Sequence, residues 1–402
     1  MAVFGQLLCY PALFRGILRS VLPRMTTTMP EEIEFAHHMM REIFENPRAV
    51  RDTIVERLSS EGTIQLQDIH ISTEELRRLT QVNILASGTS RHAGLAGKIM
   101  LQELAGIRVE VDYASEFEYC RPVIGPHELT ILITQSGETA DTIGALEAAA
   151  AKGSKTLAVC NVAGSLIAKR ADAVIYTHAG PELAVASTKA FTAQLAALFL
   201  FAVFFGEVRG TLSRDAARHH ISELLAIPEK LSRVLKTEPR CRELADKYSM
   251  ASDFLFLGRG GHLAAAMDGA LKLKEVSYIH AEGYPAGELK HGPYALVDAM
   301  MPLVFVAGKD PTDPGSMRRY NMTLQNMREV EARLGRIVAI GVEEDDEIRS
   351  VAKDFILVPG APELLLPMLE IVPLQLLAYH VALRRGLNVD APRNLVKAVT
   401  RE

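Results

Sequence analysis

The sequence predicts an α/β protein in which two similar units follow one another, each a parallel β-sheet covered by helices. Three observations lead to this prediction. Short apolar runs alternate with helical stretches of about 10 to 15 residues, as in βα units. The alternation stops over the polar, charged residues 209–248 and then restarts. The length of 402 residues is enough for two to three domains of ordinary size.

The first unit follows helical residues near the amino terminus. From residue 30, apolar side chains recur at helical spacing up to residue 46, and a second helical stretch covers residues 48–58. Five short segments then indicate strands, an apolar run at 82–86 followed by 109–113, 130–133, 156–159 and 174–176. Helices are expected up to residues 104 and 151, and over 189–205. Strands that are apolar throughout are typical of a parallel sheet buried on both faces.

The second unit follows residues 209–248, which we expect to form connecting helices. Its expected strands are 254–257, 303–307, 337–340 and 355–357, and its expected helices are 263–279, 317–334 and 365–384. The turn at 258–261 occupies the same place as Ser-Gly-Thr-Ser at 87–90, because each closes a first strand and opens a long helix. We therefore interpret the chain as an architectural repeat.

These boundaries divide the chain into six segments. Residues 1–29 are apolar, contain arginines and lack acidic residues, and we expect a disordered or mis-assigned extension rather than a targeting segment. The remaining segments are the helices at 30–75, the first unit at 76–210, the connector at 211–248, the second unit at 249–388 and the tail at 389–402.

The composition excludes several classes of function. A net charge of −5 and the absence of Trp give no support for a nucleic-acid partner. The four cysteines lie far apart without metal-ligand spacing, as in an intracellular protein with reduced thiols. The longest apolar run, 195–205, is shorter than a membrane span and indicates a buried helix. We expect a cytoplasmic enzyme of small molecules with no metal and no cofactor.

Hydroxyl-rich turns follow two strands of the first unit. One is Gly88-Thr89-Ser90 and the other is Thr134-Gln135-Ser136-Gly137-Glu138-Thr139. Helix N-termini at the carboxyl edge of a sheet offer free N–H groups to a phosphate. Helix capping also favours Ser and Thr at such places, but two such turns at one edge favour anion binding. A third stretch, 185–189, caps the next helix and is placed to close over a ligand.

Ionisable residues gather in the second unit. Lys272 and Glu275 are three apart and share a helix face, for which a solvated ion pair is the simplest interpretation. Residues 281–293 are too rich in Gly and Pro to be helix, and we interpret them as an irregular loop of the kind found in active sites. The His291 of this loop is a candidate proton carrier. Composition alone favours a disordered tail at 390–402 whose lysine is solvated.

Six motifs carry a resemblance to a known family. They are Ser-Gly-Thr-Ser at 87–90, Gln-Ser-Gly-Glu-Thr-Ala-Asp-Thr at 135–142, Val-Ala-Ser-Thr-Lys-Ala-Phe-Thr at 185–192, Gly-Ala-Leu-Lys-Leu-Lys-Glu at 269–275, Gly-Glu-Leu-Lys-His-Gly-Pro at 287–293 and Pro-Arg-Asn-Leu at 392–395. From about residue 38 onward, the chain resembles the isomerase part of glutamine:fructose-6-phosphate aminotransferase. The resemblance implies two tandem sugar-isomerase (SIS) domains with flavodoxin-like sheets, in a homodimer.

The resemblance also implies the roles of individual residues. The sugar phosphate would be held by Thr89, Ser90, Thr134, Gln135, Ser136 and Thr139, with Val185 and Ser187 lining the sugar. Glu275 matches the base that moves a proton between C1 and C2, with Lys272 as its proton-relay neighbour. His291 of the partner subunit would open the sugar ring. Lys397 matches the tail lysine that forms a Schiff base, which reverses the interpretation from composition.

Two departures from the family pattern are small and one is large. Ser87 stands where the family usually has Cys, and Thr134 where it usually has Ser, and both changes keep a small polar group. The family's glutaminase domain has no counterpart, because residues 1–37 are too few to form it. We therefore expect that this chain does not hydrolyse glutamine.

The leading hypothesis is a deaminase/isomerase that converts glucosamine 6-phosphate and water to fructose 6-phosphate and ammonia. The alternatives are a synthase subunit that uses ammonium or a separate glutaminase, a deglycase acting on another 6-phosphorylated amino-sugar adduct, and a sugar-phosphate sensor without turnover. The presence of Lys272, Glu275, His291 and Lys397 speaks against the sensor, because a sensor needs only the phosphate site.

Overall fold

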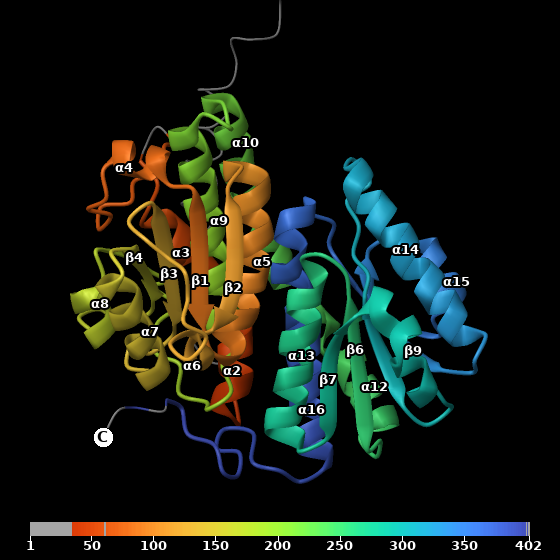
Figure 1. The fold of residues 1–402 in the computed structure, drawn as a ribbon. Helices are drawn as coiled ribbons and strands as arrows, with labels where there is room; N and C mark the ends of the chain where they lie inside the picture. Colours follow the sequence, from red (N-terminus) through yellow and green to blue (C-terminus); the bar gives the residue numbers. More distant parts are fainter. Residues whose placement is uncertain (1–33, 60–61, 399, 401–402) are drawn as a thin grey trace, which may run out of the picture.

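The computed structural model describes residues 34–59, 62–398 and 400, so the prediction for residues 1–29 lies outside the described residues. Two five-stranded sheets organise the described chain, one in each half (Figure 1). All neighbouring strands within each sheet are parallel. The predicted α/β class with two tandem parallel sheets is confirmed.

The first half holds two amino-terminal helices, a short helix and the first sheet. Its strands are β1 Gln81–Ala86, β2 Arg108–Tyr113, β3 Glu128–Thr134, β4 Lys155–Cys160 and β5 Ala173–Tyr176. Its helices are α2 His38–Phe44, α3 Asn46–Val55, α4 Thr73–Arg78, α5 Gly88–Ala105, α6 Ala114–Phe117, α7 Ala140–Ala151, α8 Leu166–Arg170 and α9 Lys189–Arg209. Strands β1, β3 and β4 are buried at every position but the first, as expected for strands covered on both faces.

Connecting helices and the second sheet complete the chain. The connector contains α10 Arg214–Leu225, α11 Ile227–Val234, the 3-10 turn η1 Leu235–Thr237 and α12 Glu238–Tyr248. The second sheet contains β6 Asp253–Gly258, β7 His280–Pro285, β8 Pro302–Val306, β9 Arg336–Val342 and β10 Asp354–Val358. Its helices are α13 His262–Ser277, η2 Ala286–His291, η3 Pro293–Leu296, α14 Pro314–Glu331, α15 Asp346–Val351, η4 Glu363–Leu365 and α16 Leu366–Arg384.

The two sheets have the same strand order when each is numbered along the chain. The first is β2-β1-β3-β4-β5 and the second is β7-β6-β8-β9-β10. The glycine that follows the first strand is left-handed in both halves, with φ of 54° at Gly88 and 57° at Gly260. The halves are therefore an architectural repeat. In this strand order the crevice for a ligand lies where the loops after β1 and β3 diverge.

Strand β7 corrects the interpretation of residues 281–293 as an irregular loop. Residues 280–285 pair in parallel with β6 at the edge of the second sheet, and the 3-10 turns follow only from residue 286. Gly283 is tolerated in this strand because helix α13 passes close by, and a Cβ there would lie 2.5 Å from the Cα of Met267. Pro285 ends the strand, where a missing N–H costs least.

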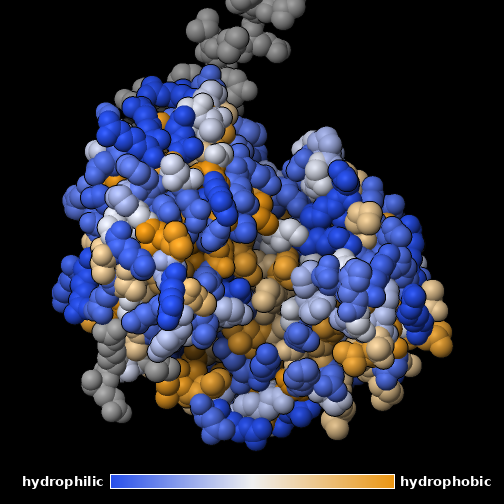
Figure 2. Space-filling model, in the orientation of Figure 1, coloured by the Kyte–Doolittle hydropathy of each residue, from blue (hydrophilic) through white to orange (hydrophobic). Residues whose placement is uncertain are grey.

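Two long apolar helices, α9 and α16, form the centre of the molecule. The stretches that contain them, Lys189–Arg209 and Glu363–Arg384, are long and apolar enough to cross a membrane. However, 83% of the most apolar segment of the first stretch and 94% of that of the second are buried inside the protein. Helix α5 packs on α9, helix α13 packs on α16, and α5 and α13 contact each other. Apolar side chains are visible along the seam between the halves on the face in Figure 2.

Candidate active site

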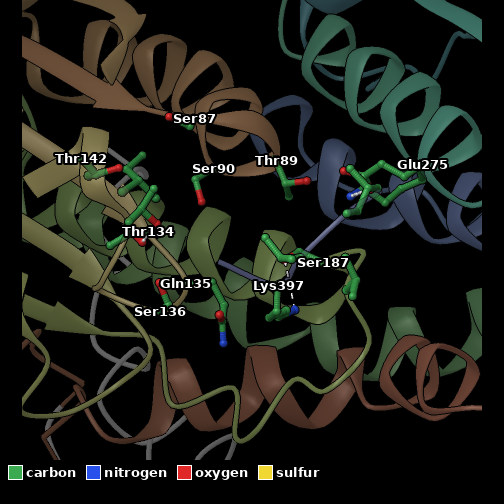
Figure 3. Close-up of a pocket in the computed structure, with 16 residues that line it drawn as sticks. Ser87, Thr89, Ser90, Thr134, Gln135, Ser136, Thr142, Ser187, Glu275 and Lys397 are labelled. Atoms are coloured by element: carbon green, nitrogen blue, oxygen red, sulfur yellow. Dashed lines mark hydrogen bonds and ion pairs between the residues drawn. The ribbon is translucent and has the colours of Figure 1, made fainter. Parts of the chain in front are cut away.

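A cavity of about 170 Å³ lies at the carboxyl ends of β1 and β3, where the strand order predicts a ligand site. Figure 3 shows polar side chains from both halves and from the tail around it. Its lining residues are Ser87, Thr89, Ser90, Ile133, Thr134, Gln135, Ser136, Thr139, Thr142, Val185, Ser187, Lys272, Glu275, Leu395, Val396 and Lys397. Eleven of the twelve site residues predicted from the sequence are among them.

The N-termini of α5 and α7 face this cavity without the capping that their sequences suggest. Ser87 and Thr139 are the N-cap residues, and neither side chain makes a capping hydrogen bond. By contrast, Ser72 and Ser213 cap α4 and α10 through their hydroxyls. Uncapped N–H groups at a positive helix end favour an anion. The structure thus removes the capping alternative at these two turns.

The turn after β3 depends on a glycine. Gly137 has a φ of 72°, and a Cβ there would lie 2.1 Å from the Ser165 hydroxyl, so a larger residue would clash. The Gly137 N–H donates to the Thr134 hydroxyl, and the Glu138 N–H donates to the Ser136 hydroxyl. The Thr134 and Thr139 hydroxyls lie 3.2 Å apart. The turn therefore presents several hydroxyls to one small volume.

Lys272 and Glu275 reach the cavity from helix α13 of the second half. The Lys272 ammonium donates to Glu275 Oε2 at 2.6 Å, and the lysine side chain is 1% exposed. Lys272 is therefore buried and Glu275 is 21% exposed, so the interpretation as a solvated ion pair is wrong for the lysine. Burial alone would lower the pKa of Lys272, but the carboxylates of Glu275 and Asp268 outweigh it and raise that pKa. Lys272 is thus a charged donor that orients Glu275.

The tail crosses from the second half beneath the first (Figure 1), which brings Lys397 into the cavity. The Asp390 carboxylate accepts the N–H groups of His38 and Met39, and the Arg393 N–H donates to the Tyr278 hydroxyl. These contacts hold the tail against both halves. The prediction of a disordered tail with a solvated lysine, drawn from composition, is wrong over residues 390–398.

Glu182 is a functional candidate that the sequence reasoning missed. The Lys397 ammonium donates to Glu182 Oε2 at 2.6 Å, to the Ala184 carbonyl at 2.8 Å and to the Ser187 hydroxyl at 3.4 Å. Glu182 Oε1 accepts the N–H groups of Thr188 and Ala190, so this glutamate caps α9 in place of the predicted hydroxyls. Its position just before the Val-Ala-Ser-Thr-Lys motif is the only signal that could have indicated it.

His291 lies outside the cavity of its own chain. It is the last residue of η2, the turn that follows β7, and it is exposed. Neighbouring Leu296 and Met300 are 59% and 69% exposed. The described residues of one chain therefore bring the hydroxyl-rich turns, Glu275 and Lys397 to one cavity and leave His291 out.

No metal centre accompanies these residues in the described part of the chain, where no group of three or more His, Cys, Asp or Glu side chains is arranged to hold a metal ion. Three free thiols occur among the described residues: Cys120, Cys160 and Cys241. Cys160 and Cys241 are buried, which raises their thiol pKa values to about 11 and about 12 and makes them poor nucleophiles.

Behind Glu182, a second buried carboxylate fixes the same loop. Glu42 of α2 is fully buried and accepts the N–H groups of Leu183 and Ala184. Burial raises its pKa to about 7, with a further contribution from Glu182. Because the pKa of this carboxyl group is higher in the folded than in the unfolded state, its protonation favours the folded state. This contribution to stability is complete below the unfolded-state pKa and is lost as the pH rises through the folded-state pKa of about 7.

We expect Glu42→Gln to flatten the pH dependence of stability. Between pH 5 and pH 9 the wild type should lose on the order of 3 kcal/mol of unfolding free energy that the variant keeps. Urea unfolding at both pH values measures the difference. Glu74→Gln, at an exposed ion pair with Arg78, is the control and should follow the wild type. Parallel wild-type and Glu42→Gln profiles would contradict the assignment.

Known proteins resemble this chain in sequence and in fold. The sequence profile of the SIS domain matches residues 75–204 and 247–385. A glutamine–fructose-6-phosphate aminotransferase (isomerizing) of Chlorobaculum tepidum is 47% identical over 92% of this chain, and one of Thermus thermophilus is 46% identical over 94%. The chain spans about 60% of the length of these relatives.

Solved structures agree with the sequence comparison. The C-terminal domain of glucosamine-fructose-6-phosphate aminotransferase from Francisella tularensis is 35% identical, with a TM-score of 0.82, and the match covers 91% of this chain and all of that one. A glucosamine-6-phosphate deaminase of Thermotoga maritima has a TM-score of 0.66 at 20% identity, with 90% of this chain and 99% of that one covered. The second likeness shows the fold alone.

Proposed function

The chain belongs to the SIS domain family and corresponds to the isomerase part of glutamine–fructose-6-phosphate aminotransferases, and we propose that it interconverts fructose 6-phosphate plus ammonia with glucosamine 6-phosphate plus water. The observation that carries the proposal is the single cavity that joins uncapped helix N-termini, a carboxylate and a lysine. A phosphate site, a proton carrier and an amine are the groups that this reaction needs.

The phosphate is held at the turns after β1 and β3. Residues of both turns line the cavity with hydroxyl or amide groups: Ser87, Thr89 and Ser90 after β1, and Thr134, Gln135, Ser136 and Thr139 after β3. Val185 and Ser187 close the opposite side. Fixing the phosphate places the sugar carbons between Lys397 and Glu275, which lie on different elements of the cavity wall.

The chemical steps use three side chains. The Lys397 amine condenses with the C2 carbonyl of the open ketose and releases water. Ammonia replaces Lys397 at C2, and Glu275 carries a proton from C1 to C2, which yields the 2-amino aldose. The Lys272 ammonium holds Glu275 by one oxygen, so the other oxygen is left for the substrate proton. Without ammonia, the same proton transfer would interconvert fructose 6-phosphate and glucose 6-phosphate.

Ring opening requires a second copy of the chain in this proposal. His291 of the partner subunit would enter the cavity, because the chain's own His291 lies outside it. The exposed apolar side chains of Leu296 and Met300, five and nine residues further along the chain, suit an interface with that copy. We therefore propose a cytoplasmic homodimer whose active sites are shared between subunits.

The source of ammonia separates two forms of the proposal. The chain spans about 60% of the length of relatives that are named as glutamine–fructose-6-phosphate aminotransferases. A glutaminase on another polypeptide or segment would feed the amination, and free ammonium would support either direction. The leading form remains the reaction run toward fructose 6-phosphate and ammonia, as a deaminase.

Product analysis tests the proposal directly. The purified protein is incubated with glucosamine 6-phosphate, and ammonia and fructose 6-phosphate are measured, followed by the reverse reaction with ammonium. Release of the two products in equal amounts supports the proposed chemistry. Tight binding of the sugar phosphate without turnover in either direction, and without isomerisation to glucose 6-phosphate, would instead indicate a sensor.

We expect Thr139→Ala to weaken binding of fructose 6-phosphate by roughly 10- to 100-fold, since one hydrogen bond to a charged group is lost. Binding of unphosphorylated fructose should be unchanged, which makes it the internal control. Isothermal titration measures both affinities. Equal losses for the two sugars would remove Thr139 from the phosphate site.

A further inference from the structure

The environment of Lys397 contains one carboxylate in direct contact with its nitrogen, that of Glu182. This side chain is 1% exposed, and its two oxygens have separate tasks. Oε2 accepts from Lys397 at 2.6 Å, and Oε1 accepts the N–H groups of Thr188 at 2.9 Å and Ala190 at 3.1 Å. Because both oxygens are held, the carboxylate cannot swing away from the lysine nitrogen when the tail reacts.

Glu182 is also charged at rest. Burial alone would raise the pKa of Glu182, but Lys397 and the two backbone donors outweigh it and hold the pKa below its ordinary value. A buried anion of this kind is stable only beside a buried cation. In the resting protein that cation is the Lys397 ammonium.

The chemistry of the proposed reaction keeps a positive charge at the same atom. When an alkyl ammonium and a ketone condense, the new C–N double bond replaces the C–O double bond, and one water leaves. The product is a protonated iminium that carries the single positive charge on the former lysine nitrogen. Glu182 neither gains nor loses a proton overall, so atoms and charge balance.

We propose that Glu182 is the counter-ion of the iminium formed on Lys397. This inference rests on the proposed function, and it assigns to Glu182 the task of keeping the iminium protonated. A protonated iminium withdraws electrons from C2 far better than a neutral imine does, so it makes C2 electrophilic enough for ammonia to attack and displace Lys397. In the isomerisation without ammonia, it also makes the C1 proton acidic enough for Glu275 to remove. The Glu182 carboxylate is held in this position by N–H groups at the α9 N-terminus.

Other charged groups face this pair, and the test must separate them. Glu42 lies behind the loop, Lys189 is paired with Glu45, and Lys272 and Glu275 line the same cavity. The Lys189–Glu45 pair provides a matched control, because it too joins a buried lysine to a glutamate near the start of α9. Neither of its members lines the cavity.

The experiment traps the iminium with cyanoborohydride, which reduces the protonated form in preference to the neutral imine. Protein and fructose 6-phosphate are mixed from pH 5 to pH 10, and the reduced adduct on Lys397 is measured by mass spectrometry. For Glu182→Gln we expect both limbs of the pH profile to move about 1 to 3 units lower, since an opposite charge in contact shifts a titration by that amount. At pH 8, trapping should fall roughly 10-fold or more.

The controls decide between a counter-ion and a packing role. Glu45→Gln should keep the wild-type profile, and Glu42→Gln shows how much of any shift belongs to Glu42. Glu182→Gln should bind fructose 6-phosphate within about threefold of the wild type. If it does not bind, Glu182→Asp is used instead, because its carboxylate is one methylene shorter and stands further from the nitrogen. A shifted profile with retained binding in either variant supports the proposal.

Two further results would overturn the inference, and they can be told apart. If the wild type forms no adduct while binding fructose 6-phosphate, Lys397 is not the reacting amine, and the proposed function fails together with the role of Glu182. If the wild type and the tested Glu182 variant form adduct with superimposable pH profiles, Lys397 reacts without a counter-ion, and the role of Glu182 alone is wrong.

Discussion

Replacing Lys397 with alanine is expected to lower turnover of glucosamine 6-phosphate by roughly a thousandfold or more, since the other lysine of the cavity, Lys272, is held by the Glu275 carboxylate and is not available to form the covalent intermediate. Fructose 6-phosphate should still bind, because the phosphate turns after β1 and β3 do not depend on the tail. Coupled measurement of ammonia release and isothermal titration of fructose 6-phosphate give the two quantities. Surviving turnover would show that the Schiff-base role is wrong.

Lys397→Arg separates the chemistry from stability. Lys397→Ala leaves the Glu182 carboxylate buried without its cation, which should destabilise the fold. Breaking a fully buried ion pair costs about 3 to 5 kcal/mol. The loss here should be smaller, because the Lys397 side chain is 25% exposed. Arginine keeps the positive charge but cannot form an imine under these conditions. We therefore expect Lys397→Arg to be inactive with nearly wild-type stability, and activity in this variant would exclude imine formation.

Mixing two inactive variants is expected to restore activity if His291 acts across a dimer. In a heterodimer of His291→Ala with Lys397→Ala, one site has both residues intact and the other has neither. Random exchange makes half of the dimers mixed, so recovered activity should reach about 25% of the wild-type value. The variants are unfolded and refolded together, and turnover is compared with each variant refolded alone.

The control for this experiment is a mixture of two variants on the same side of the shared site. Lys397→Ala with Glu275→Gln should stay inactive in every dimer, because Glu275 and Lys397 line the cavity of one chain and no subunit then has both. Absence of recovery in the His291 and Lys397 mixture would argue for a site built within one chain, to which His291 does not contribute.

Much of the fold follows from local patterns of the sequence. Nine predicted strands are present, because buried parallel strands such as β1 and β3 are apolar nearly throughout and cannot be confused with exposed segments. The strand that was missed, β7, has the sequence His-Ala-Glu-Gly-Tyr-Pro, which carries no strand pattern. It exists because β6 offers it a hydrogen-bonding edge and α13 leaves room only for glycine at residue 283.

The site was predicted in its residue types and only partly in its contacts. Motifs indicated the hydroxyl turns, Lys272, Glu275 and Lys397, and all of these line one cavity. The catalytic and binding roles assigned to them stay predictions. Glu182 and Glu42 were missed because a lone glutamate in a loop or an amphipathic helix has no pattern of its own. Each acquires meaning from what lies beside it, Lys397 in one case and the Leu183–Ala184 backbone in the other.

The sequence by itself determined the two parallel sheets, the hydroxyl-rich turns and the set of ionisable residues, because strand burial and turn chemistry are properties of short segments. The tertiary structure decided three other matters: that Ser87 and Thr139 leave their helices uncapped, that Lys272 is buried against Glu275, and that the tail carries Lys397 across to Glu182. The partners in that last contact are 215 residues apart. Such contacts arise only when both halves and the tail have packed together, since burial and ion pairing depend on groups that no local sequence window contains.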